Sequence, residues 1–102
     1  MAVTQSFSAE DKTLTVNISG RFDFGLHQEF RTAYEQLSGP KPSAYVINLN
    51  NATYLDSSAL GMLLLLRDHA GGDNARITLK NANADVTKIL AISNFDKLFT
   101  IE

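Results

Sequence analysis

The sequence of 102 residues contains no cysteine and no tryptophan. The lack of cysteine excludes disulfides, thiolate metal sites and cysteine nucleophiles. Histidine is also scarce, and neither His27 nor His69 is spaced from a second His, Asp or Glu in a metal-binding pattern. We therefore interpret both as surface histidines, and we predict no metal site and no cofactor.

Long apolar runs and clusters of basic residues are missing as well. The longest uncharged apolar run, residues 59–66, is far shorter than the roughly 20 residues of a membrane span. The N-terminus lacks the positive region and apolar stretch of a secretory signal. The net charge is −2, and no group of Lys or Arg forms a basic patch for phosphate backbones. These absences predict a cytoplasmic protein that binds neither membrane nor nucleic acid.

The sequence also lacks two common enzymatic motifs. Gly71 and Gly72 follow a predicted helix, whereas a glycine-rich phosphate loop precedes one. The serines at 57 and 58 lie in L-D-S-S-A-L-G, which does not have the flanking glycines of a hydrolase nucleophile. With no histidine base, metal set or phosphate loop, we predict that the protein is not an enzyme.

The periodicity of the remaining sequence predicts a fold of alternating strands and helices. The composition, 44% hydrophobic and 20% charged, is typical of one globular domain spanning 1–102. Apolar patterns predict strands at 3–8, 13–19, 44–49 and 76–80, with a final edge strand in LFTIE. The near-continuous apolar run at 44–49 is typical of a strand that is covered on both faces.

Three helices are predicted between these strands. The first follows a loop RFDFG and has an apolar stripe of Leu26, Phe30, Ala33, Tyr34 and Leu37. The second is expected at 57–70, after a loop NNATYLD, and the third at 84–93. The order β-β-α-β-α-β-α-β predicts a single α/β domain with a mixed, mostly parallel sheet and helices packed against it.

The stretch Asp56-Ser57-Ser58 precedes the second predicted helix. Asp and Ser are common N-cap residues, and capping contributes about 1 kcal/mol. The helix that follows is apolar on every side over two turns, so either its neighbours cover it fully or part of it meets another protein. A phosphate on a serine in the first turn would be tolerated by the fold, because the helix N-terminus favours negative charge. It would also repel a partner that docks on this helix.

These residues resemble a known family. The segment Leu55-Asp56-Ser57-Ser58-Ala59-Leu60-Gly61 is similar to the signature of bacterial anti-sigma-factor antagonists of the STAS domain family. Gly20-Arg21-Phe22-Asp23 resembles the family's G-x-L-D turn, and residues 75–80, 84–93 and 95–101 resemble its fourth strand, third helix and closing segment. Many members continue into a further helix, which we expect to be absent or very short in this chain.

The resemblance implies a phosphorylation switch without catalysis. The phosphorylated serine would be Ser57, with Ser58 as the other local hydroxyl. The unphosphorylated form would bind an anti-sigma factor or switch serine kinase and free a sigma factor or other target, and a metal-dependent serine phosphatase would reset the cycle. We expect the partner to contact Asp23, Asp56, Ser57, Ser58 and Met62. The alternative is a STAS scaffold or transporter-associated subunit that is never phosphorylated.

Overall fold

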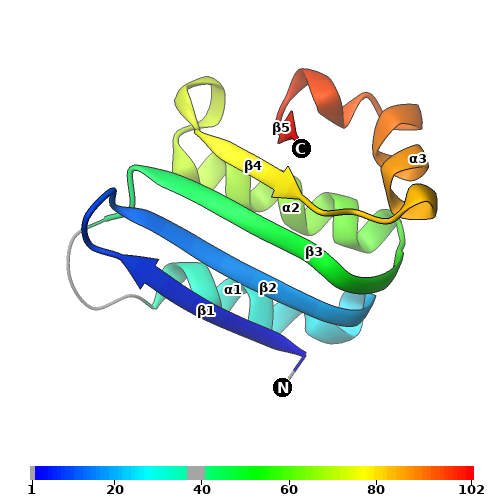
Figure 1. The fold of residues 1–102 in the computed structure, drawn as a ribbon, viewed down its shortest axis with the longest axis horizontal. Coiled ribbons are helices and arrows are strands. Elements are labelled where there is room, and N and C mark those ends of the chain that lie inside the picture. The colour runs from blue at the N-terminus through cyan, green and yellow to red at the C-terminus, as the bar shows by residue number, and fades with distance from the viewer. Residues whose placement is uncertain (1, 37–40) are drawn as a thin grey trace.

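The computed structural model describes residues 2–36 and 41–102, and Figure 1 shows how their strands and helices are arranged. The strands are β1 (Val3–Ser8), β2 (Thr13–Phe22), β3 (Ala44–Leu55), β4 (Ile77–Lys80) and β5 (Thr100–Ile101). The helices are α1 (His27–Glu35), α2 (Ser57–Ala70) and α3 (Ala84–Ile92). Short 3-10 helices span Phe24–Leu26, Gly72–Asn74 and Phe95–Lys97. This order confirms the predicted α/β alternation.

The strands form one mixed sheet in the order β1-β2-β3-β4-β5. β1 and β2 are antiparallel, whereas β2, β3, β4 and β5 pair in parallel, each joined to the next through a helix. The strands follow their sequence order because each strand-helix-strand crossover places the next strand beside the last. The predicted mostly parallel sheet is therefore confirmed.

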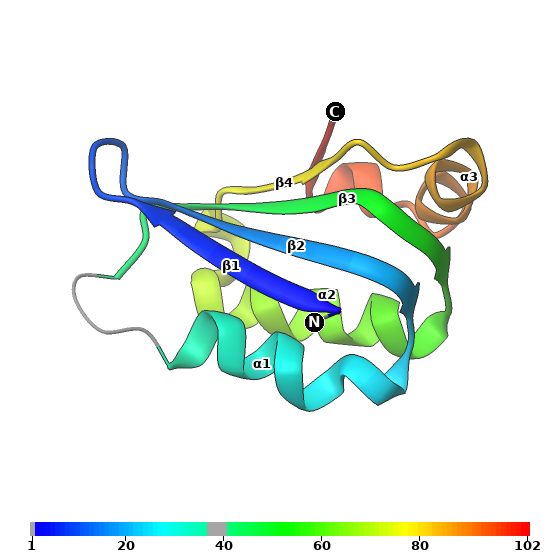
Figure 2. The same ribbon diagram turned by 60° about the horizontal axis from the view of Figure 1, so that its bottom comes forward.

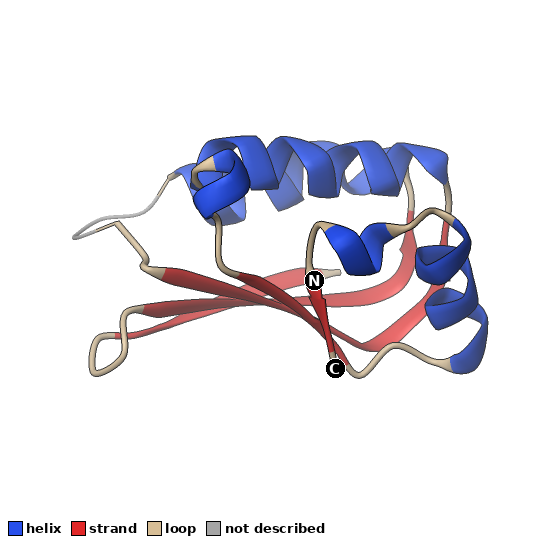
Figure 3. Cartoon of the chain, turned by 90° about the horizontal axis from the view of Figure 1, so that it is seen from above, coloured by secondary structure: helices blue, strands red, loops and turns tan. Residues whose placement is uncertain are grey.

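The core lies between one face of the sheet and helices α1 and α2, which run along that face (Figures 2 and 3). On β2 and β3, alternate apolar side chains such as Leu14, Val16 and Ile47 are fully buried. The predicted stripe of α1 packs against them through Phe30, Ala33 and Tyr34. Leu37, the last predicted member of this stripe, lies outside the described residues.

The opposite face of the sheet is more polar. Asn48 of β3 donates to Asn17 of β2 at 2.9 Å and accepts from Asn81 at 3.2 Å, while Asn17 donates to Thr4 of β1 at 3.3 Å. Residues of β3 on this face are only half-buried. The prediction that β3 is covered on both faces is therefore wrong for this face, because α1 and α2 both lie on the other side of the sheet.

Two strands extend beyond their predicted ends. β2 continues through Phe22 rather than stopping at residue 19, and β3 continues to Leu55 through the segment predicted as a loop. Register shifts between Asn17 and Ser19 and between Gly20 and Arg21 interrupt the alternation of the pair. These bulges break the alternation of buried and exposed residues in the last part of β3, which is still paired as a strand.

Candidate functional site at the ends of β2 and β3

The predicted site residues follow two neighbouring parallel strands. Phe22, the last residue of β2, pairs with Leu55, the last residue of β3. Asp23 comes directly after Phe22, and Asp56 comes directly after Leu55. Since both strands end at the same edge of the sheet, the turn that begins at Asp23 and the start of α2 are neighbours. The fold therefore brings together the two segments that the sequence singled out.

Asp56 caps the N-terminus of α2. Its backbone is extended, and its Oδ1 accepts hydrogen bonds from the Ala59 backbone N–H at 3.0 Å and from the Ser58 hydroxyl at 2.6 Å. The Ser58 hydroxyl first, and then the backbone N–H of Ala59, hold the pKa of the Asp56 carboxyl below its usual value. Capping is thus part of this motif, and it uses Asp56 and Ser58.

Ser57 is placed differently from Ser58. It is the first residue of α2 and is exposed, whereas Ser58 is half-buried. Within the described part of the chain, the Ser57 hydroxyl makes no hydrogen bond. The two adjacent serines therefore differ in solvent exposure and in hydrogen bonding, a difference that the sequence did not reveal.

Helix α2 has a buried side and an exposed side. Leu63 and Leu66 are fully buried in the core, and Met62 is 4% exposed. The outer stripe starts at Ser57 and continues through Gly61 to Leu64 and Leu65, which are 39% and 54% exposed. Neighbours therefore cover only one side of this apolar helix.

The burial of Met62 corrects the expectation that it contacts a partner. Its side chain points into the core between α2 and the rest of the domain, where a docking protein does not reach it. The exposed apolar positions on α2 are Leu64 and Leu65, which lie on the same helical face as Ser57. These two leucines replace Met62 in the candidate surface.

Asp23 begins the 3-10 helix Phe24–Leu26 and caps it by accepting from the Gly25 N–H at 2.9 Å. Its other carboxylate oxygen lies 3.6 Å from the Arg21 guanidinium, which stacks over the Tyr54 ring at 4.1 Å. Phe24 is 68% exposed beside this turn. The sequence reasoning missed Arg21, Phe24 and Tyr54.

The missed residues had one readable signal. In a strand, side chains alternate between faces, so Arg21 beside buried Phe22 and Tyr54 beside buried Leu55 point outward. The alternation predicts the outward direction of Arg21 and Tyr54 only if β2 is taken to reach residue 22 and β3 to reach residue 55. Because the polar residues there were interpreted as loops, the exposed partners were overlooked.

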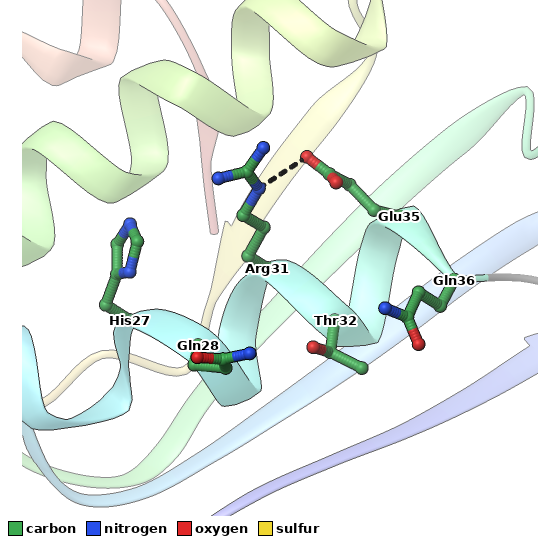
Figure 4. A pocket seen from close by; sticks show the side chains of 6 residues that line it. All are labelled: His27, Gln28, Arg31, Thr32, Glu35 and Gln36. Carbon is green, nitrogen blue, oxygen red and sulfur yellow. Dashed lines mark hydrogen bonds and ion pairs between the residues drawn. The ribbon is translucent and has the colours of Figure 1, made fainter.

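A polar hollow lies against the outer side of α1. It has a volume of about 260 Å³ and is lined by His27, Gln28, Arg31, Thr32, Glu35 and Gln36 (Figure 4). Arg31 is paired with Glu35 at 2.8 Å, and His27 stacks on Phe24 with ring centroids 5.2 Å apart. Among residues 2–36 and 41–102, no three potential metal ligands gather.

Comparison with known proteins agrees with this geometry. The Mlab STAS domain family matches residues 6–100. The chain belongs to the STAS domain family. A STAS-domain containing protein of Pseudomonas aeruginosa (strain UCBPP-PA14), PA14_20770, is 63% identical over 101 residues, covering 99% of each chain.

Solved structures share the STAS fold at low identity. The anti-sigma factor antagonist SpoIIAA in its unphosphorylated form has a TM-score of 0.72 at 18% identity, over 99% of this chain and 87% of that one. The phosphorylated form of SpoIIAA, a Bacillus cell fate determinant, gives 0.67 at 17% identity, covering 99% and 91%. A sulfate transporter family protein of Wolinella succinogenes gives 0.73 at 11% identity, covering 93% and 80%. In the described part of this chain, no helix has the length and apolar character to cross a bilayer.

Proposed function

We propose that this STAS domain is a cytoplasmic anti-sigma-factor antagonist that works as a phosphorylation-controlled binding switch at Ser57. The unphosphorylated form binds an anti-sigma factor or switch serine kinase and frees a sigma factor or other target. Phosphorylation blocks this binding, and a metal-dependent serine phosphatase restores it. The observation that carries the proposal is the exposed Ser57 hydroxyl on the same face of α2 as Leu64 and Leu65.

The position of Ser57 suits a modification that changes binding and not the fold. A phosphate in the first turn lies at the positive end of the helix dipole, so α2 tolerates it. It adds about −1.5 to −2 charges next to the carboxylate of Asp56. A partner that covers the leucines beyond Ser57 would have to desolvate this charge, which is costly without a matching cation.

The loss of affinity that such a switch requires is comparable to the cost of burying an unpaired charge. Moving a two-state equilibrium from almost fully bound to almost fully free takes about 5.5 kcal/mol of differential affinity. An unpaired charge buried at an interface costs several kcal/mol. A single phosphate at the rim of an apolar contact is therefore a sufficient switch.

The partner surface combines the two segments at the sheet edge. Leu64 and Leu65 supply apolar contact, while Asp23, Asp56, Ser57 and Ser58 form a polar rim. Phe24, 68% exposed beside Asp23, adds an aromatic anchor of the kind enriched at interfaces. Apart from Arg21, the charged residues of this surface are Asp23 and Asp56, so a phosphate on Ser57 would add negative charge to a rim that is already acidic.

Mapping the phosphate tests the proposal directly. The protein is purified from its own cells, and the phosphorylated residue is identified in the native chain and in Ser57→Ala and Ser58→Ala variants. We expect the phosphate to disappear in Ser57→Ala and to persist in Ser58→Ala. A phosphate confined to Ser58, or none under any growth condition, would contradict the proposed switch.

Binding provides a second test with a matched control. Ser57→Asp places a negative charge at the first residue of α2, and Ala84→Asp places one at the first residue of α3, where Ala84 is exposed. Against the anti-sigma factor or kinase recovered with the native protein, we expect only Ser57→Asp to lose affinity. Equal affinity of both variants would count against the proposal.

The alternative is a STAS scaffold or transporter-associated subunit. The likeness to the sulfate transporter family protein favours it, since that fold also serves in a transporter family. In this case the exposed face of α2 would bind a constant partner, and Ser57 would remain unmodified. The phosphate map therefore discriminates between the two functions.

A further inference from the structure

No strand among the described residues, 2–36 and 41–102, pairs with the outer row of backbone groups of β1. This strand lies at one end of the strand order, with β2 on its inner side (Figure 1). The Ser19 N–H donates to the Ala2 carbonyl at 2.8 Å, and Ala2 pairs with Ser19 in the same register as Val3 with Ile18. Since bonded pairs alternate along an antiparallel ladder, the backbone groups that point away from β2 belong to Val3, Gln5 and Phe7.

A hollow lies beside this free edge on the helix side of the sheet. It has a volume of about 290 Å³, is mainly apolar, and is lined by Val3, Gln5, Gln28, Glu29, Thr32 and Ala33. Helix α1 forms its other wall and lies along β1 (Figure 2). Phe7 points to the same side of the sheet, because it pairs with buried Leu14, and its side chain is 36% exposed.

We propose that β1 pairs with β1 of a second copy of this chain in an antiparallel, two-fold symmetric dimer. In the proposed register, Gln5 lies opposite Gln5 of the second copy. Val3 then lies opposite the second copy's Phe7, and Phe7 lies opposite the second copy's Val3. These three pairs satisfy all the outward backbone groups of Val3, Gln5 and Phe7 on both strands. The sheets of the two copies then form one continuous sheet.

The same register places the exposed Phe7 at the hollow. Residues directly opposite in an antiparallel pair point to the same face, and their side chains are neighbours. Phe7 of each copy therefore lies over Val3 of the other, which lines the hollow between β1 and α1. On the other face, Thr4 lies opposite the second copy's Ser6, and their hydroxyls are within reach of each other.

The composition of the edge favours a second copy as the occupant. Edge strands that avoid pairing usually carry charged residues or proline, but Val3–Ser8 reads VTQSFS and contains neither. The two copies thus meet without like charges along the paired strands. The self-complementary register also matches the isologous contact of a two-fold dimer.

The size of the contact sets its strength. A stable interface uses about 20–30 residues a side, whereas this one offers a strand of 6 residues and one face of α1. We therefore expect a weak dimer that forms as concentration rises. The hollow contains no residue of α2, so dimerisation leaves the outer stripe of α2 open and is independent of the proposed switch.

Sedimentation velocity over a concentration series tests the dimer, using protein with its native, untagged N-terminus. Gln5 is exposed, so the Gln5→Lys and Gln5→Glu variants retain the monomer fold, which circular dichroism verifies. Each variant places like charges opposite each other at the two-fold axis and should weaken dimerisation by roughly tenfold or more. An equimolar mixture of the two should restore the dimer as a heterodimer, while the Ala91→Lys control on α3 should dimerise like the native chain.

Phe7→Ser tests the hollow separately, with Ile92→Ser as its control. Ile92 is 72% exposed on α3, so this control removes a comparable exposed apolar side chain elsewhere. We expect only Phe7→Ser to weaken the dimer. A native chain that stays monomeric up to millimolar concentration, or a charge-swapped mixture that stays monomeric, would overturn the proposal.

Discussion

The hydroxyl of Ser58 donates to Asp56 Oδ1 at 2.6 Å, and the same oxygen accepts from the Ala59 N–H at 3.0 Å. The two adjacent serines at the start of α2 therefore have different surroundings. Ser58 supports the N-cap of the helix, whereas Ser57 is exposed at the first helical position. The cap thus uses the hydroxyl of Ser58, and the proposed switch would use the hydroxyl of Ser57.

The cap should be measurable in the stability of the domain. Asp56→Ala removes the acceptor for the Ala59 N–H and should lower the free energy of unfolding by about 0.5–2 kcal/mol. Ser57→Ala changes an exposed side chain and should stay within about 0.5 kcal/mol of the native chain. Urea denaturation of both variants checks this, and an equal loss in Ser57→Ala would show that its hydroxyl also supports the cap.

The stability of the domain should also depend on pH through Asp56. The hydrogen bonds from Ser58 and Ala59 hold its pKa in the folded state below the ordinary value of 3.8. Between the folded and unfolded pKa values, the unfolded chain binds a proton at Asp56 more readily than the folded chain does. The ionised Asp56 carboxylate therefore stabilises the fold fully at pH values above its ordinary pKa. This stabilisation is lost as the pH falls through the lower pKa of the folded state.

Asp56→Asn isolates this dependence, because asparagine is an equally good N-cap without the charge. We expect the free energy of unfolding of the native chain to fall relative to that of Asp56→Asn when the pH drops below the ordinary pKa of an aspartate. Urea denaturation of both chains from neutral pH to below pH 3.8 measures the difference. A difference that stays constant over that range would exclude the carboxylate as its source.

Gly61 is predicted to lower the stability of α2 and to leave space for the partner. It lies in the interior of α2 on the outer stripe, and a Cβ added there would meet nothing within 4 Å. Gly61→Ala should therefore raise the free energy of unfolding by about 0.5–1 kcal/mol, because alanine favours the helix. The added methyl group stands between Ser57 and Leu65 and should weaken the partner complex in a titration. Unchanged affinity would show that the partner does not approach this part of the helix closely.

Much of the fold could be predicted from sequence, because hydrophobic periodicity records which face of an element is buried. The bounds of α2, Ser57–Ala70, match their prediction because Asp56 and Gly71 mark both ends. The prediction failed where bulges break that periodicity, in the continuation of β3 to Leu55. Register pairing between β2 and β3 holds this segment as a strand, and no local pattern encodes such a long-range constraint.

The candidate site was predictable in part for a similar reason. The motif around Asp56 signals a helix start, and its place after a strand puts it at a sheet edge. Which side of α2 is buried depends on how α1 and the sheet pack around it. A helix that is apolar on all sides carries no period to decide this, which is why Met62 was named as a partner contact although it is buried, while the exposed Leu65 was not singled out.

A pair of substitutions on α2 separates the buried side from the binding side. Met62→Ala should lower the free energy of unfolding by about 2–5 kcal/mol, because it leaves a cavity in the core. Leu65→Ala should change stability by less than about 0.5 kcal/mol but weaken the partner complex, since Leu65 is 54% exposed on the stripe of Ser57. Ile92→Ala, an exposed apolar position on α3, serves as the control for general surface effects. If Leu65→Ala binds the partner as tightly as Ile92→Ala does, the outer face of α2 is not the docking surface, and a switch at Ser57 would have nothing beside it to control.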